Sequence, residues 1–216
     1  MGVRTAVGFV IGLIAVLGIN FIPFEMLYYG DFSGESAMAF YAAENLVTVG
    51  FATAFVLLFA PVREKNPDYE RRDELLKKHP AFPIDRFREK KEILKLYLVF
   101  SLGFTAASLI FLTAFIAIVL KTEIQFSEIL GGMAWLSAFL LIQYIGDLIG
   151  LRPFTLAKAE ALLKQSMGRV ALLFLAVFAG IFLALLVDRW FVFPFIALKT
   201  LVDIGGLIGI FTRSER

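Results

Sequence analysis

The chain has 216 residues, of which 59% are hydrophobic and only 19% are charged, and its mean hydropathy is +0.81. This composition is far more apolar than that of a soluble domain and indicates a membrane protein. The formal net charge is only +2, and the basic residues are concentrated in a few connections, so we expect no nucleic-acid partner. The sequence contains no cysteine, which excludes disulfides, thiolate metal sites and cysteine nucleophiles.

Six apolar segments have about the length that a helix needs to cross a bilayer, roughly 20 residues. We therefore predict one all-α domain over residues 1–216, a polytopic protein of the cell membrane with six transmembrane helices at about residues 5–24, 37–62, 96–120, 129–150, 170–187 and 191–211. We expect the first span to be retained, because it is longer than a typical signal-peptide core and no small-residue cleavage site follows it. Within it, Gly8 and Gly12 form a small-xxx-small step at which a second helix could approach closely.

The charges of the connections predict the topology. Segment 63–95 is the one long hydrophilic stretch and mixes basic with acidic residues, and the connection from Arg152 to Arg169 is basic. Under the positive-inside rule both connections are cytoplasmic, and so are both termini. The basic side chains there would meet lipid headgroups, so the expected partners are the bilayer and anionic lipid at the cytoplasmic loops.

Both cytoplasmic connections are predicted to contain helices. In the first, Asn66 followed by Pro67 is typical of a helix start, and a second charged helix is expected to run from Asp85 directly into the third span. In the second, residues 155–168 predict a separate amphipathic helix on the membrane surface.

Polar residues within the spans follow helical spacing and form stripes. The second span carries side chains that recur every three or four residues, which are Tyr41, Glu44, Asn45, Thr48 and Ala52. We expect this stripe to face protein rather than lipid. Smaller polar stripes lie on the third and fourth spans, namely Ser101, Thr105 and Ser108, and then Ser137, Tyr144 and Asp147 with Gln143 beside them.

The last span contains two charges, Lys199 and Asp203, each of which costs about 2.5 to 3.5 kcal/mol at mid-membrane unless it finds a partner. Glu44 and Lys199 lie at similar depths, about 10 and 14 Å from the outer ends of their spans at a rise of about 1.5 Å per residue. We therefore predict an interhelical Glu44–Lys199 pair, with Asp203 one turn deeper and within reach of Tyr144 or Asn45. The predicted buried polar cluster consists of Glu44, Asn45, Tyr144, Asp147, Lys199 and Asp203.

Glycine pairs near the inner ends of the fourth and sixth spans predict a helix contact. Gly146 and Gly150 form one GxxxG step, and Gly205 and Gly209 form another at a similar depth. Because the two helices run in the same direction, we expect their cytoplasmic ends to pack closely against each other.

No motif of catalysis or cofactor binding is found. The sequence lacks HExxH, GxSxG, a P-loop and a GxGxxG that follows a strand, and its single histidine, His79, cannot form a paired-histidine metal site. We therefore expect no catalytic residue, no metal and no cofactor.

Four short motifs carry a resemblance to a known family, namely YAAENLVTVGF at 41–51, YIG at 144–146, MGRV at 167–170 and LKTLVDIGG at 198–206. The chain resembles an uncharacterised family of archaeal and bacterial polytopic membrane proteins, known only as a domain of unknown function. The resemblance implies that its signature positions here are Glu44, Asn45, Arg169, Lys199 and Asp203. It implies an architecture and a site, and it implies no activity.

Two roles for the buried cluster stay open. In the first, the charges are a satisfied network that fixes helix register, and the protein is an integral membrane scaffold, a homo-oligomer or a subunit of a larger assembly. In the second, Glu44, Lys199 and Asp203 line a polar cavity and make the protein a proton- or ion-coupled transporter or channel. A dry, directly bonded network would favour the first role, and a cavity open to one side would favour the second.

Overall fold

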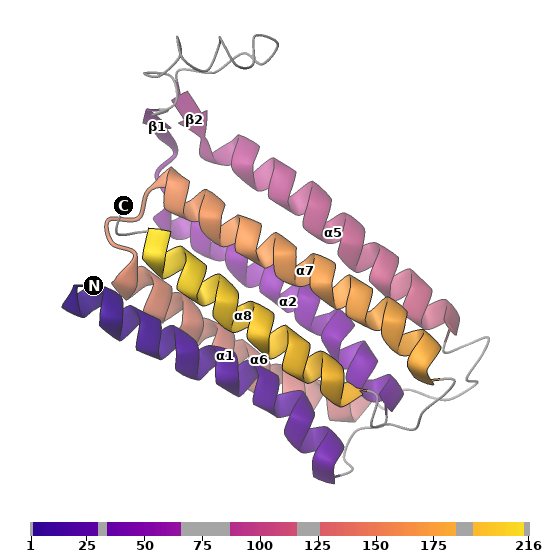
Figure 1. Cartoon of the computed structure of the whole chain (residues 1–216). Helices are drawn as coiled ribbons and strands as arrows, with labels where there is room; N and C mark the ends of the chain where they lie inside the picture. Colours follow the sequence, from indigo (N-terminus) through magenta and orange to yellow (C-terminus); the bar gives the residue numbers. More distant parts are fainter. Residues whose placement is uncertain (1, 30–33, 66–86, 116–125, 185–191, 214–216) are drawn as a thin grey trace, which may run out of the picture.

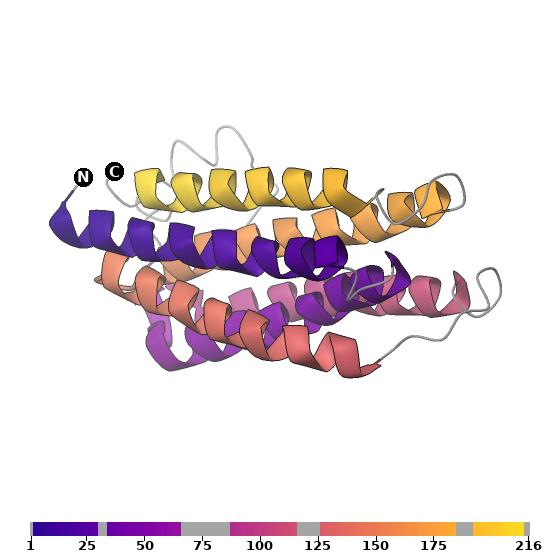
Figure 2. The ribbon, with the colours of Figure 1, turned by 90° about the horizontal axis from the view of Figure 1, so that it is seen from below.

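The computed structural model describes residues 2–29, 34–65, 87–115, 126–184 and 192–213, which form six helices and one small pair of strands. The elements in chain order are α1 (Val3–Tyr29), α2 (Gly34–Phe59), β1 (Arg63–Lys65), β2 (Phe87–Glu89), α5 (Lys90–Phe115), α6 (Phe126–Gly150), α7 (Leu156–Ala184) and α8 (Val192–Arg213). The helices lie side by side in one bundle and run along its long dimension (Figures 1 and 2). The predicted all-α fold with six helices is confirmed.

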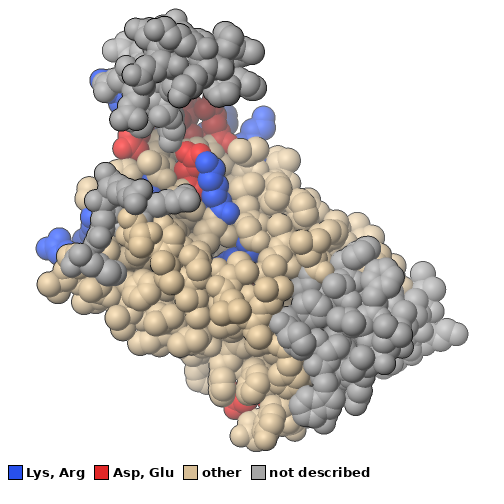
Figure 3. All heavy atoms as spheres, viewed as in Figure 1, with Lys and Arg blue, Asp and Glu red and all other residues tan. Residues whose placement is uncertain are grey.

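Four of the helices are long and apolar enough to cross a membrane, over Val3–Tyr29, Ala39–Phe59, Lys90–Ala114 and Ile129–Gly150. On the face seen in Figure 3, charged side chains gather mainly at the end of the bundle near the strands, while the flank is made almost wholly of other residues. A flank with few charged side chains suits the hydrocarbon core of a bilayer, where an unpaired charge is costly. The chain is therefore a multi-pass membrane protein.

The helix α1 begins, and the helix α8 ends, at the same end of the bundle (Figure 1). The strands β1 and β2 lie at this end too, and so does the connection between α6 and α7. We call it the terminal end. The common position of these segments matches the arrangement predicted from charge, and the side of the membrane on which they lie stays a prediction.

Two predicted local structures are wrong. The helix α7 is continuous from Leu156 to Ala184, so the surface helix and the fifth span are one element. No proline interrupts it, and Gly168 costs a helix only about 1 kcal/mol. The second error concerns the charged helix that was expected to begin at Asp85. Residues 87–89 form a strand instead, and α5 begins at Lys90. The helix predicted to start at Asn66 lies outside the described residues.

The strand pair ties three helices together at the terminal end. Arg63 pairs with Glu89 in an antiparallel register, and the Lys90 amine donates to Leu57 O and Ala60 O at 2.9 and 3.0 Å, where α2 ends. Glu64 accepts a hydrogen bond from the backbone N–H of Leu156, the first residue of α7. Polar groups that helix ends leave unpaired are thereby satisfied from other elements.

The glycine contact occurs between α1 and α6, the most extensively packed helix pair, rather than between α6 and α8. A Cβ atom on Gly8 would lie 2.6 Å from both Gly146 O and Gly150 Cα, so the two backbones touch. By contrast, a Cβ on Gly205 or Gly209 would meet nothing within 4 Å. The predicted packing of Gly205 and Gly209 against Gly146 and Gly150 is therefore wrong, and the step at Gly8 and Gly12 supplies the partner instead. The helix α8 reaches the end of α6 through Phe211, whose ring a Cβ on Gly150 would strike.

The polar stripe of α2 faces protein, as predicted. All five members are buried in the bundle, namely Tyr41, Glu44, Asn45, Thr48 and Ala52. The stripe of α5 is buried as well, since Ser101, Thr105 and Ser108 are almost completely covered. Because α2 packs against α5, α6 and α7, its stripe brings a charged group into the middle of the bundle.

A buried charge network between the helices

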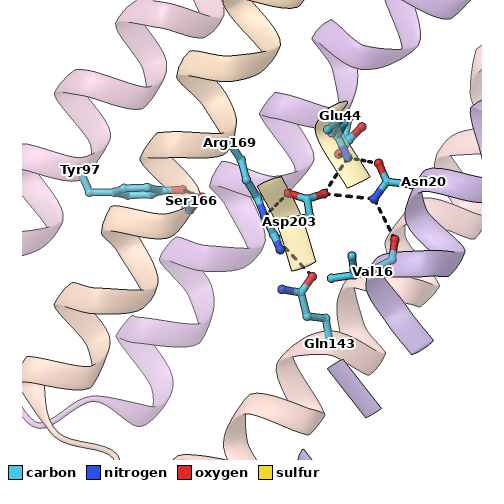
Figure 4. A network of polar contacts seen from close by, with 9 residues as sticks. Val16, Asn20, Glu44, Tyr97, Gln143, Ser166, Arg169 and Asp203 are labelled. Carbon is cyan, nitrogen blue, oxygen red and sulfur yellow. Dashed lines mark hydrogen bonds and ion pairs between the residues drawn. The ribbon is translucent and has the colours of Figure 1, made fainter. Parts of the chain in front are cut away.

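Six buried polar side chains from five helices meet inside the bundle (Figure 4). We call this group the charge network. It contains two carboxylates, two cations and two amides, namely Glu44 of α2, Asp203 and Lys199 of α8, Arg169 of α7, Asn20 of α1 and Gln143 of α6. Helical spacing explains the contribution of α8, because Lys199 and Asp203 are four residues apart and therefore lie on one face.

The Lys199 ammonium group is shared among three acceptors. Its Nζ lies 2.9 Å from Glu44 Oε1, 3.1 Å from Asp203 Oδ2 and 3.0 Å from Asn20 Oδ1. An ammonium group has three N–H bonds, so these contacts use its full donor capacity. The Glu44–Lys199 pair predicted from matching depth is present.

Asp203 holds the second cation. Its Oδ1 lies 2.7 Å from Arg169 Nε, while its Oδ2 accepts from Lys199 and, at 3.1 Å, from Asn20 Nδ2. Arg169 extends the network to α6, because its Nη1 donates to Gln143 Oε1 at 3.3 Å. None of the interactions found within the described residues joins Asp203 to Tyr144 or Asn45, which were the partners expected from sequence.

The network is electrically balanced and compact. Two positive and two negative side chains alternate in space, so each charge has an opposite charge at 3.1 Å or less. An unpaired charge in a low-dielectric interior costs several kcal/mol, whereas a paired and hydrogen-bonded one costs far less. The arrangement therefore meets the requirement that the two charges of the last span impose on the rest of the chain.

Arg169 is the largest difference from the sequence-based assignment. Its charge placed it in the cytoplasmic connection with Arg152, yet it is 9% exposed and lies within the network. Arg152 is exposed at the terminal end. The reason is the continuity of α7, which carries Arg169 about 13 residues, or roughly 20 Å, from the helix start. The motif MGRV had implied that this arginine is a signature position.

Two members of the network were missed, and both are neutral amides. Asn20 is the only amide in the first span, and its Nδ2 also donates to Val16 O of its own helix at 2.8 Å. A lone amide in a long apolar segment was the available signal, because burying it in lipid without partners is unfavourable. Gln143 lies beside the polar stripe predicted for the fourth span, but nothing in its spacing connects it to Arg169.

Three residues of the predicted cluster are buried near the network without belonging to it. Tyr144 stacks against Phe51 and Phe55 of α2, with ring centroids 6.2 and 4.9 Å apart. The Asn45 amide and Asp147 Oδ1 have no hydrogen-bond partner among the residues that the structure describes. The sequence therefore identified a buried polar region correctly, but it did not separate the charged centre from its surroundings.

A second polar link joins α5 to α7. The hydroxyl groups of Tyr97 and Ser166 lie 2.8 Å apart, and both side chains are buried. Ser166 precedes Arg169 by three residues on the same helix, so this link lies about one turn from the charge network (Figure 4).

Comparison with known proteins gives one family. The model of a family of unknown function, DUF6498, matches residues 8–215 and thus nearly the whole chain. No curated protein and no solved structure matches the chain.

Proposed function

We propose that this chain, which belongs to the DUF6498 family of unknown function, is a six-span membrane protein that serves as a scaffold or subunit of a membrane assembly, with its helices locked by the charge network. The observation that carries the proposal is the direct pairing of all four charges between α2, α7 and α8. Such pairing gives no better stability than apolar packing, but it specifies one register of the helices.

The direct contacts support a structural role. No separation in the network exceeds 3.3 Å, which leaves no space for a solute between the paired groups. Through the amides of Asn20 and Gln143, the helices α1 and α6 are also joined to the charge network. A helix that slid by one residue, about 1.5 Å, would break several of these contacts together.

For topology, we propose that the terminal end is cytoplasmic. Basic residues are exposed there, including Arg4, Arg152 and Lys164, and the positive-inside rule favours the cytoplasm for such residues. The same side chains would contact anionic lipid headgroups.

Proton- or ion-coupled transport is a second candidate, and one observation favours it. Lys199 is shared between carboxylates on two different helices, Glu44 and Asp203, while Glu44 Oε2 has no hydrogen-bond partner within the described residues. Protonation of Glu44 would remove its negative charge and so weaken its interaction with the Lys199 ammonium group. The network could then couple protonation to a small shift of α2 against α8.

Flux measurements separate the two candidates. Proton and cation flux would be measured in proteoliposomes with the wild type, Glu44→Gln and Lys199→Met, and thermal unfolding would show which variants are folded. Glu92→Gln and Lys95→Met are matched controls, because they make the same changes at exposed positions of α5. A structural network predicts no flux in the wild type and lower stability in the two network variants. Flux in the wild type that is lost in a folded variant would establish transport instead.

The scaffold role itself predicts an assembly. The protein would be extracted from its native membrane in polymer-bounded lipid discs, and its mass would be measured without added detergent. A complex heavier than one chain of 24.1 kDa and of defined stoichiometry is expected. A single chain throughout would contradict the role.

A further inference from the structure

One buried carboxyl group takes no part in the charge network. Asp147 of α6 is 2% exposed, and its Oδ1 has no hydrogen-bond partner in the part of the chain that the structure describes. The ion pairs found in the buried core go to Glu44 and Asp203 instead. A buried carboxylate without a partner costs far more free energy than the neutral acid does, so this group is suited to take up a proton.

Asp147 lies between the network and the terminal end. It follows Gln143 by one helical turn, and α6 ends three residues later at Gly150, about 4.5 Å further along the axis. Asp203, by contrast, is ten residues from the end of α8, about 15 Å. Just beyond Gly150, Arg152 is exposed and the Lys158 amine donates to Leu151 O at 2.9 Å. Among the buried carboxyl groups Glu44, Asp147 and Asp203, Asp147 therefore lies nearest along its helix to the terminal end.

Arg169 connects Asp147 to the network. Its guanidinium group interacts electrostatically with both Asp147 and Asp203. The other titratable neighbour is Tyr144 on the same helix. Within the described residues, Arg169 is the charged group that acts on Asp147. The other helices packed beside this part of α6 contribute apolar groups, namely Gly8 of α1 against Gly146, Phe211 of α8 against Gly150, and Phe51 and Phe55 of α2 against Tyr144.

We propose that Asp147 is a proton-binding site through which the charge network communicates with the aqueous phase at the terminal end. A hydronium ion gives its proton to a carboxylate oxygen of Asp147 and leaves as water. With Asp147 neutral, Arg169 pairs with Asp203 without competition from Asp147 and keeps its hydrogen bond to Gln143. With Asp147 ionised, the two carboxylates compete for one guanidinium group. The site does not require the scaffold role, and it does not require net transport.

Infrared difference spectroscopy of the protein in lipid vesicles tests the site. In the wild type we expect a C=O stretching band of a protonated carboxylic acid whose intensity changes with pH. Asp147→Asn should remove this band, and Asp147→Glu should keep it at a shifted frequency. The matched control Glu92→Gln, at an exposed position of α5, should leave it unchanged. If Asp147→Asn does not fold, Asp147→Glu tests the assignment instead. A shifted band frequency in that variant would assign the band to residue 147, and an unshifted one would exclude it.

The direction of access is tested on the same samples. The chain has no cysteine, so Arg152→Cys gives a single thiol at the terminal end, and a membrane-impermeant reagent then reports the side on which this end lies. The band should respond to a pH change on that side. A band that does not titrate, one that Asp147→Asn leaves unchanged, or one that responds only to the opposite side would overturn the proposal.

Discussion

Lys199 Nζ of α8 lies 2.9 Å from Glu44 Oε1 of α2, and both side chains are buried. Lys199 also contacts Asp203, so its removal leaves two carboxylates with fewer partners. We expect Lys199→Met to lower the free energy of unfolding by about 3–5 kcal/mol, the usual effect of breaking a buried ion pair from one side. Chemical unfolding in detergent micelles would measure it. A change as small as that of Lys95→Met would contradict the pairing.

Glu44→Gln should lower the free energy of unfolding less than Lys199→Met does, because Lys199 keeps Asp203 and Asn20 as partners. The double variant should be more stable than the sum of the two single effects predicts, since it removes both members of one pair. The same unfolding measurement on all four proteins gives the coupling energy. Additive effects would mean that the two groups do not interact.

The glycines of α1 and α6 predict opposite outcomes from those of α8. Gly8→Ala places a methyl group against the backbone of Gly146 and Gly150. We therefore expect overpacking to lower the free energy of unfolding by about 1–3 kcal/mol. Gly205→Ala meets open space and should be neutral or stabilising by up to about 1 kcal/mol, because alanine is the better helix former. Thermal unfolding of the two variants would check this, and equal losses would be inconsistent with an α1–α6 contact.

Sequence patterns predicted those features that depend on one helix at a time. Burial of the α2 stripe follows from its spacing, and the Glu44–Lys199 pair follows from depth, because an unpaired charge in a membrane is so costly. Sequence patterns did not predict which helices pack against each other. The GxxxG step of α8 has the same local pattern as that of α6, and only the packing of the whole bundle decides that Gly8 rather than Gly205 faces Gly146.

The position of Arg169 shows a second limit. The positive-inside rule counts charges near the ends of spans, and it assigned this arginine to the cytoplasm because a break in the helix was expected before it. The helix is continuous, and Asp203 offers a partner that lies 34 residues further along the chain. Long-range compensation of this kind leaves no periodic signal in a single sequence.

Tyr97 and Ser166 predict a further test of how α5 is held. Their hydroxyl groups are 2.8 Å apart and buried, so Tyr97→Phe should lower the free energy of unfolding by about 1 kcal/mol through the lost hydrogen bond. Tyr28→Phe is the matched control, because Tyr28 is 59% exposed. Unfolding in detergent would compare the two. An equal effect of both changes would show that the hydroxyl contact contributes nothing.

The Lys90 side chain predicts a distinct effect at the terminal end. Its ammonium group donates to Leu57 O and Ala60 O, carbonyl groups at the end of α2, and it carries the charge that a helix C-terminus favours. We expect Lys90→Met to lower the free energy of unfolding by about 0.5–1.5 kcal/mol. Hydrogen exchange should speed up in the last turn of α2, while the charge network stays protected. Lys91→Met is the control, since the adjacent Lys91 is exposed. The same exchange pattern in both variants would show that the loss of one positive charge, rather than of the cap, is responsible.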